Sequence, residues 1–160
     1  MAVKAQISER LRFSTTIGTG IPMSSPASTP FAWQVLGYYT INQRLSAGIG
    51  AGISLYEKTL IPLFADAKFN ITKPKKFTPY IECGVGYSFA ISQNANGGFY
   101  LSPSVGIEWS IYGRNKLLLA IGYESQSLER LKMHEDQYFD AEFKEQLNHN
   151  AISIKIGFIF

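Results

Sequence analysis

Apolar and polar residues alternate with a period of two along most of the chain. In residues 45–55, leucine, isoleucine and alanine occupy the odd positions, and serine and glycine occupy the even ones. Because successive side chains of a β-strand point to opposite faces, this alternation predicts strands with one apolar face. The pattern recurs in eight segments, which are residues 11–17, 31–41, 45–55, 61–71, 79–91, 101–111, 117–124 and 152–160.

The connections between these segments fall into two classes. Three are short and polar, at residues 42–44, 72–76 and 113–116. The others are mostly longer, at residues 18–30, 92–98 and 126–148, with a short exception at 56–59. Short turns at one end and longer loops at the other are typical of transmembrane barrels, and an even number of antiparallel strands can close without edges. The sequence therefore predicts an all-β fold, an eight-stranded antiparallel up-and-down transmembrane β-barrel.

Two classes of eight-stranded barrel differ in which face of their strands contacts water. A soluble lipocalin-like carrier points its apolar face inward to hold a hydrophobic ligand and turns a charged face to water. Here the face opposite the apolar one is built of small residues with occasional charges, which suits a crowded interior. The apolar face is unbroken over all eight segments and would be an aggregation hazard in water, whereas in lipid it is the solvent contact. We predict a membrane barrel and keep the soluble carrier as the alternative.

Strand length agrees with a membrane span. Ten residue steps from Leu45 to Leu55 cover about 33 Å, and a tilt of about 40° reduces this to about 25 Å, the height of an outer-membrane apolar band.

Cys83 lies on the apolar face, where we interpret it as a small apolar side chain, and a single cysteine excludes an internal disulfide. The side chains predicted to face lipid are Trp33, Ile49, Ile53, Leu63, Phe69, Val85, Phe89, Ile107, Trp109, Leu119, Ile121, Ile154, Ile156 and Phe158.

Charged residues on the opposite face predict a polar cluster inside the barrel. Buried charges are tolerated when they are paired and hydrogen-bonded. Counted from the short turns, with the shear of the barrel ignored, Lys68, Glu82, Glu108 and Lys155 lie at similar heights. Eight strands leave little room beyond side chains, so we predict a plugged lumen. The predicted interior cluster is Arg12, Asp66, Lys68, Glu82, Glu108, Glu124 and Lys155.

Glycines and prolines inside the predicted strands need their own interpretation. Gly48, Gly50 and Gly52 form G-x-G-x-G within a strand, without the helix of a nucleotide-binding loop, so they predict tight packing inside a narrow barrel. Proline lacks the N–H that a closed barrel needs at every position, so we expect bulges or strand ends at three prolines. These are Pro62, Pro79 and Pro103.

Composition excludes several other classes. Only 17% of the 160 residues are charged, against roughly 25% in an average soluble domain, and 46% are hydrophobic, which excludes a disordered chain. No apolar run approaches the roughly 18 residues of a membrane helix. The net charge of +3 is small and dispersed, so we expect no nucleic-acid partner.

The chain resembles the small eight-stranded outer-membrane barrels of Gram-negative bacteria, the class that includes OmpX and the membrane domain of OmpA. The resemblance extends from about Leu11 to Phe160 and is sharpest at the C-terminus, where the alternation ends in Phe158 and Phe160. These aromatics resemble the terminal signal that the barrel assembly machinery reads. The Gly-rich strand and residues 61–65 further resemble barrel proteins of the Bacteroides group. The resemblance implies a location in the cell outer membrane, contact with its lipids, and short turns and termini on the periplasmic side.

The N-terminal residues do not resemble a signal peptide, because Met1–Leu11 contains charges and no apolar segment. We expect residues 1–10 to be an N-terminal extension or an expression remnant, and residues 11–160 to form a single barrel domain. Val3-Lys4-Ala5 resembles the end of a cleavage site, which would start the mature chain at Gln6.

The short turns carry Arg44, Lys73, Lys75, Lys76, Arg114 and Lys116 and no acid, which suits anionic lipid headgroups or simply reflects turn composition.

The connection at residues 126–148 holds six of the twelve acids in the sequence. A divalent-cation or partner site is one interpretation, since histidine and carboxylates are ordinary ligands, and a solvated loop or extended hairpin is the other. Phe139, Phe143 and Leu147 at i, i+4 and i+8 fit one face of a helix, and the aromatics equally fit contacts with an extracellular partner. The external candidates are His134, Glu135, Asp136, Tyr138 and Phe139.

Catalysis has little support in the sequence. His134-Glu135-Asp136-Gln137 is not H-E-x-x-H, so it gives no zinc-protease signal. Some outer-membrane barrels modify lipids with rim histidines and serines, and the only such residues here are Ser125, Ser127, His134 and His149, without a recognisable spacing. We therefore expect no catalytic residue, no cofactor and no metal, and keep a lipid-modifying enzyme as the second alternative. The expected role is structural or interactive, through the external loops.

Overall fold

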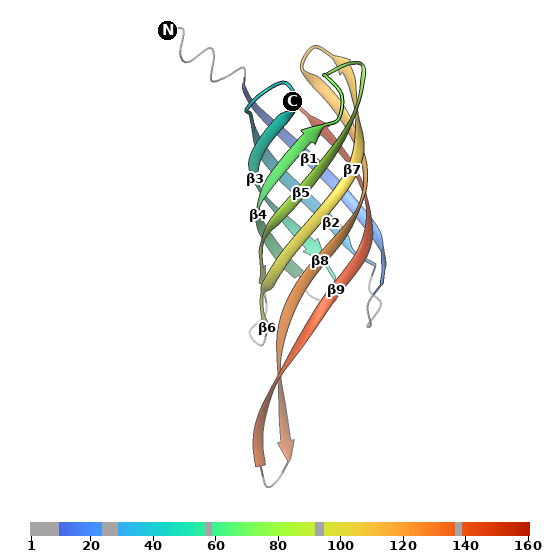
Figure 1. The fold of residues 1–160 in the computed structure, drawn as a ribbon. Coiled ribbons are helices and arrows are strands. Elements are labelled where there is room, and N and C mark those ends of the chain that lie inside the picture. Colours follow the sequence, from blue (N-terminus) through green and yellow to red (C-terminus); the bar gives the residue numbers. More distant parts are fainter. Residues whose placement is uncertain (1–9, 24–28, 57–58, 92–94, 137–138) are drawn as a thin grey trace.

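Eight long antiparallel strands close into a tilted barrel (Figure 1). The computed structural model describes residues 10–23, 29–56, 59–91, 95–136 and 139–160, and for residues 95, 130–136, 139–145 and 147 it describes the backbone alone. The N-terminal residues 1–9, with the interpreted cleavage site, lie outside this part. The strands are β1 (Leu11–Pro22), β2 (Phe31–Thr40), β3 (Leu45–Leu55), β4 (Thr59–Asn70), β5 (Phe77–Ala90), β6 (Ala95–Asn96), β7 (Gly98–Tyr112), β8 (Asn115–Asp136) and β9 (Phe139–Ile159). In the described ranges no helix has the length and apolarity needed to cross a membrane.

Strand pairing follows the chain order and then closes on itself. Each long strand pairs with its sequence neighbour, and β9 pairs with both β8 and β1. The seam between β1 and β9 runs from Ser14↔Ile159 to Pro22↔Ala151. The two-residue β6 is not one of the eight barrel strands. It pairs with β8, at Ala95↔Arg130 and Asn96↔Glu129. The predicted eight-stranded barrel is therefore confirmed.

The two ends of the barrel differ. The three short turns, the start of β1 and the end of β9 lie at one end (Figure 1). At the other end β8 and β9 continue far beyond the rim as a two-stranded ribbon, which we call the external hairpin (residues 127–136 and 139–148). Its two strands stay in register from the barrel wall to Asp136↔Phe139. The extended-hairpin interpretation of residues 126–148 is thus confirmed for the described residues, and a helix through Phe143 is wrong.

Two prolines lie inside strands that keep their register, so the expected bulges or strand ends there are wrong. Pro62 pairs with Ser88 of β5, while the β3–β4 pairing lapses between Leu63 and Leu60 without a change of register. Pro103 similarly pairs with β5 while its pairing to β8 lapses. In both cases the missing N–H of proline interrupts the pairing with only one of the two neighbouring strands. Pro79 is the third residue of β5 and pairs with Ile107 of β7 without a change of register, so the expected bulge or strand end is wrong there too.

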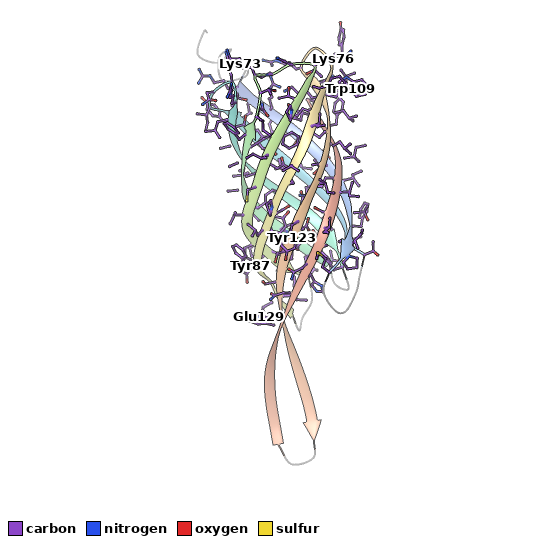
Figure 2. The ribbon with its side chains drawn as sticks, turned by 45° about the vertical axis from the view of Figure 1, so that its right-hand side comes forward. Lys73, Lys76, Tyr87, Trp109, Tyr123 and Glu129 are labelled. Carbon is purple, nitrogen blue, oxygen red and sulfur yellow. The ribbon has the colours of Figure 1, made fainter. Side chains whose placement is uncertain are left out.

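Burial alternates along most of each barrel strand: the inward positions hold polar residues, tyrosines and a few apolar side chains, and the outward positions hold mostly apolar and aromatic ones. Gln34 on β2 is 3% exposed, whereas its neighbour Trp33 is 46% exposed. Outward aromatics lie toward both ends of the barrel, with Trp109 near the short turns and Tyr87 and Tyr123 toward the hairpin (Figure 2). This orientation is opposite to that of a soluble carrier, whose apolar face would line a cavity, and it contradicts that alternative.

Candidate functional site: the barrel interior and its two mouths

Large aromatic side chains cluster in the barrel interior, and glycines on neighbouring strands make room for them. Leu36, Tyr38, Phe64 and Tyr100 form one buried cluster. Phe64 is the ladder partner of Gly50 on β3 and of Gly86 on β5. A Cβ at Gly50 would lie 2.7 Å from the Phe64 ring. The tight packing predicted from the glycine-rich strand is thus explained by the side chains that the glycines accommodate.

Polar groups surround this aromatic centre. Ser104 Oγ donates a hydrogen bond to Glu82 Oε1 at 2.9 Å, and the Tyr38 hydroxyl lies 3.3 Å from Glu82 Oε2. Lys155 Nζ donates to Ser102 Oγ at 2.7 Å. The space left between these groups measures only about 10 Å³, enough for about one water molecule.

A charge network lies on the short-turn side of the aromatic centre. Glu108 accepts from Lys116 Nζ at 2.5 Å and forms a second ion pair with Lys68. All three side chains are largely buried, with Glu108 only 3% exposed. The Lys68 ammonium also lies 4.2 Å from the centre of the Tyr80 ring, a cation–π distance.

Beyond this network the barrel opens into a cavity of about 250 Å³, which we call the short-turn mouth. Its wall includes Arg12, Ser46 and Asn70, and it reaches the turn residues Gln43 and Pro74. The Lys68, Glu108 and Lys116 side chains form its floor. The mouth therefore combines one carboxylate with three cations.

At the opposite end, Gln126 on β8 connects three strands, β3, β5 and β8, through its amide. It accepts from Ser88 Oγ at 2.9 Å and donates to Ser54 Oγ at 3.1 Å and to Glu124 Oε1 at 2.5 Å. The Tyr56 hydroxyl donates to the same Glu124 oxygen at 3.1 Å. Burial and, to a smaller extent, the Glu124 charge raise the pKa of Tyr56, so this phenol stays protonated as a donor.

His149 lies in this external layer, with its ring 5.0 Å from the Tyr56 ring and stacked on it. Ser125 and Ser127 face the other side of the sheet, where they donate to Asn150 and Asn148 respectively. Because alternate residues of a strand point to opposite faces, these serines are not brought to His149. The serine–histidine pairing that a lipid-modifying enzyme would need is not assembled from these residues.

Several solved structures share this fold. Neither a family model nor a curated protein sequence matches the chain. OprG of Pseudomonas aeruginosa matches its structure with a TM-score of 0.65 at 10% identity, covering 94% of this chain and 95% of that one. Neisserial surface protein A matches with a TM-score of 0.62 at 13% identity, covering 93% and 95%. AlkL, an outer-membrane protein solved in lipid bilayers, matches with 0.60 at 9% identity, covering 94% and 89%. The fold is that of the small outer-membrane barrels.

Within this outer-membrane barrel fold, the seven charges predicted for the interior all lie on inward-facing positions, but in three groups rather than one. Arg12, Lys68 and Glu108 lie at the short-turn mouth, and Glu124 lies at the external end. Asp66, Glu82 and Lys155 lie between them, around the small central space. Glu82 is the ladder partner of Lys68, but Glu82 and Lys155 line the central space whereas Lys68 and Glu108 line the short-turn mouth, so the four charges do not form one cluster.

Several interior residues were missed by sequence reasoning. Lys116 was assigned to a turn, yet it shares the Glu108 carboxylate. Gln126 and Tyr56 were assigned to loops, yet they organise the external layer. A detectable signal existed only for the aromatics, since Tyr38, Tyr80 and Tyr100 each face a glycine in the ladder, namely Gly48, Gly106 and Gly86.

The predicted lipid-facing residues point outward from this outer-membrane barrel fold. Thirteen of them are exposed, from 40% for Phe69 to 74% for Ile49, and Phe158 is half-buried. Cys83 lies on the same face and is half-buried. Of the external candidates, His134, Glu135 and Asp136 lie at the end of β8 and Phe139 at the start of β9, with only their backbone described, and Tyr138 lies outside the described residues.

Proposed function

We propose that this chain is an integral outer-membrane protein whose role is structural or interactive and is carried by the external hairpin, without catalysis. The observation that supports membrane insertion most directly is the belt of exposed apolar side chains around the whole barrel. Soluble monomers rarely expose a contiguous apolar patch beyond a few hundred square ångströms, whereas in a bilayer such a belt is in contact with lipid tails. Closure of the barrel supports the same proposal, since it leaves no backbone edge in the hydrocarbon.

The orientation follows from the two different ends. We place the short turns and the chain ends in the periplasm and the external hairpin outside the cell, with outer-membrane lipids around the belt. The C-terminal strand would be the part that the barrel assembly machinery recognises, through Phe158 and Phe160. Replacing Phe160 by alanine should then lower incorporation into outer membranes in cells while leaving refolding in detergent unchanged. Equal incorporation of the variant and the parent chain would refute this role.

A lumen closed by side chains accompanies this role. The aromatic cluster around Phe64 and Tyr100 and the small central space favour a scaffold over a pore. Conductance measurements on planar bilayers should give no ion-conducting steps from the parent chain. Stable channels would show that the lumen opens and would refute this part of the proposal.

The hairpin supports an interaction role because it presents backbone edges. Within the described ranges, β8 beyond Arg130 pairs only with β9, and β9 before Asn150 pairs only with β8. Unpaired N–H and C=O groups along such an edge can accept an extended segment of another protein by strand addition. A rigid barrel carrying a projecting ribbon is suited to this mode of binding.

Membrane insertion is tested by refolding the full chain with and without maltoside detergent. We expect a β-type circular dichroism spectrum and a band on gels that shifts on boiling, only when detergent is present. A monodisperse β monomer without detergent would refute membrane insertion.

The interaction role is tested with a shortened hairpin. Glu129 and Gln146 are ladder partners, so residues 130–145 can be replaced by Asn-Gly without stretching the chain. We expect the shortened chain to keep its heat-modifiable band and to lose binding to host cells or surface proteins. As a matched control, the parent hairpin with Asn-Gly in place of residues 137–138 should keep binding. Unchanged binding by the shortened chain would refute the hairpin as the interacting element.

A further inference from the structure

The short-turn mouth carries more positive charge than its own residues neutralise. Glu108 is its only carboxylate among the described lining residues, and two lysines, Lys68 and Lys116, share it. Arg12 also lines the cavity, half-buried, and forms no ion pair with any carboxylate in the described part of the chain. Three cations against one anion leave an excess of about two positive charges in a confined space.

Hydrogen-bonding groups line the same cavity. Thr40, Gln43 and Ser46 contribute hydroxyl and amide groups from β2, the first turn and β3. Asn70 contributes an amide from the end of β4, and its side-chain oxygen is buried without a hydrogen-bond partner. Because Asn70 Oδ1 is an acceptor, it can receive a hydrogen bond from an occupant that carries a hydroxyl group.

The turns around the mouth add further cations on a fixed frame. Asn42 Oδ1 accepts from the backbone N–H groups of Arg44 and Leu45 at 2.9 and 2.8 Å, which fixes the first turn. In the second turn, the Lys75 N–H donates to Thr78 Oγ1 at 3.0 Å. Figure 2 shows Lys73 and Lys76 at this end of the barrel. The exposed cations of the three turns are Arg44, Lys73, Lys75, Lys76 and Arg114.

We propose that the short-turn mouth is a binding site for a phosphate group. Phosphate oxygens suit this set of donors, because a guanidinium binds two of them at once and ammonium groups add charge-assisted hydrogen bonds. The cavity of about 250 Å³ holds one such group with its first substituent, and the turn cations attract it from outside. The group is either free phosphate or the headgroup of an anionic phospholipid in the facing leaflet.

The experiment uses the full chain refolded in decyl maltoside, which contains no phosphate. Inorganic phosphate and monomeric dihexanoyl-phosphatidylglycerol are titrated separately by calorimetry. Arg12→Gln removes the unpaired cation from the cavity, and Arg114→Gln removes one charge from an exposed turn residue at the same end as a matched control. Ser46→Phe fills the cavity without a change of charge, and a heat-modifiable band establishes that each variant is folded.

We expect saturable 1:1 binding of either ligand. Arg12→Gln should weaken this binding about tenfold, which corresponds to the loss of one strong charge-assisted contact. Arg114→Gln should weaken it less than about twofold. Ser46→Phe should abolish it. Binding of phosphate identifies the free ion as sufficient, whereas binding of phosphatidylglycerol alone identifies the lipid headgroup as the source. The proposal is overturned if neither ligand binds saturably, or if Arg12→Gln and Arg114→Gln weaken binding equally, since bulk charge would then explain the effect.

Discussion

Tyr80 and Gly106 are ladder partners on β5 and β7, and the Tyr80 phenol occupies the space that a side chain at position 106 would need. A Cβ built on Gly106 lies 2.7 Å from both Cζ and the hydroxyl oxygen of Tyr80, and 2.5 Å from the backbone oxygen of Leu119 on the other side. Tyr80 is 1% exposed and packs with Leu118 and Ile159 under the short-turn mouth. The interior of the barrel therefore depends on pairing each large aromatic with a glycine on the next strand.

Gly106→Ala should destabilise the barrel by about 1–3 kcal/mol, because the added methyl overpacks the space held by Tyr80. Urea unfolding in phospholipid vesicles measures the change. Gly37→Ala is the matched control, since its Cβ would meet only the Phe13 ring at ordinary contact distances of 3.5 and 3.7 Å. Equal stability of the two variants would contradict the packing account.

Glu108→Gln should cost about 3–5 kcal/mol of stability, because it removes the carboxylate that forms ion pairs with the buried Lys68 and the largely buried Lys116. The free energy of unfolding in the same vesicles gives the value. As a control, Glu129→Gln changes a carboxylate that accepts one long hydrogen bond of 3.4 Å from Gln146 among the described side chains, so its effect should stay within about 0.5 kcal/mol. A loss below about 1 kcal/mol for Glu108→Gln would mean that the network is not a stabilising unit.

The barrel strands were predictable because each must present one face to a single solvent and the other to the interior. Leu45–Leu55 was predicted with the observed bounds, since its alternation begins and ends at polar turns. The same rule did not predict that the external hairpin consists of two strands. Beyond the rim the two strands no longer separate a bilayer from a barrel interior, so the requirement for one apolar face does not apply to a residue such as Glu135.

The interior was predictable only in part. Alternation identifies which charges point inward, but strand tilt and shear decide which of them meet. Lys68 therefore pairs with Glu108 two strands away, while its ladder partner Glu82 accepts from Ser104. Lys116 was missed because it follows a turn closely, where a lysine normally points to water. The central aromatics were underestimated because the glycines that accommodate them suggested only small side chains.

Ile49→Arg should hinder folding into vesicles by about 2–4 kcal/mol, because Ile49 lies midway along β3 on the outward face and would place a charge in the hydrocarbon. Tyr112→Arg is the control at the end of β7, where the side chain is 85% exposed and a charge can reach the headgroups. The folded fraction in vesicles measures both. If the outward face met water, Ile49→Arg would be nearly neutral, because Ile49 is 74% exposed.

The most direct test of the account asks whether the outward face contacts lipid. The two tryptophans of the chain, Trp33 and Trp109, are exposed toward opposite ends of the barrel, so Trp33→Phe and Trp109→Phe each leave one reporter. Each single-tryptophan chain is refolded in phosphatidylcholine vesicles that carry bromine at a defined depth of the acyl chain. The account predicts quenching of both tryptophans, stronger with bromine near the headgroup than near the bilayer centre, as in interfacial aromatic belts. Fluorescence that bromine does not quench in either chain, with the barrel folded, would contradict the account.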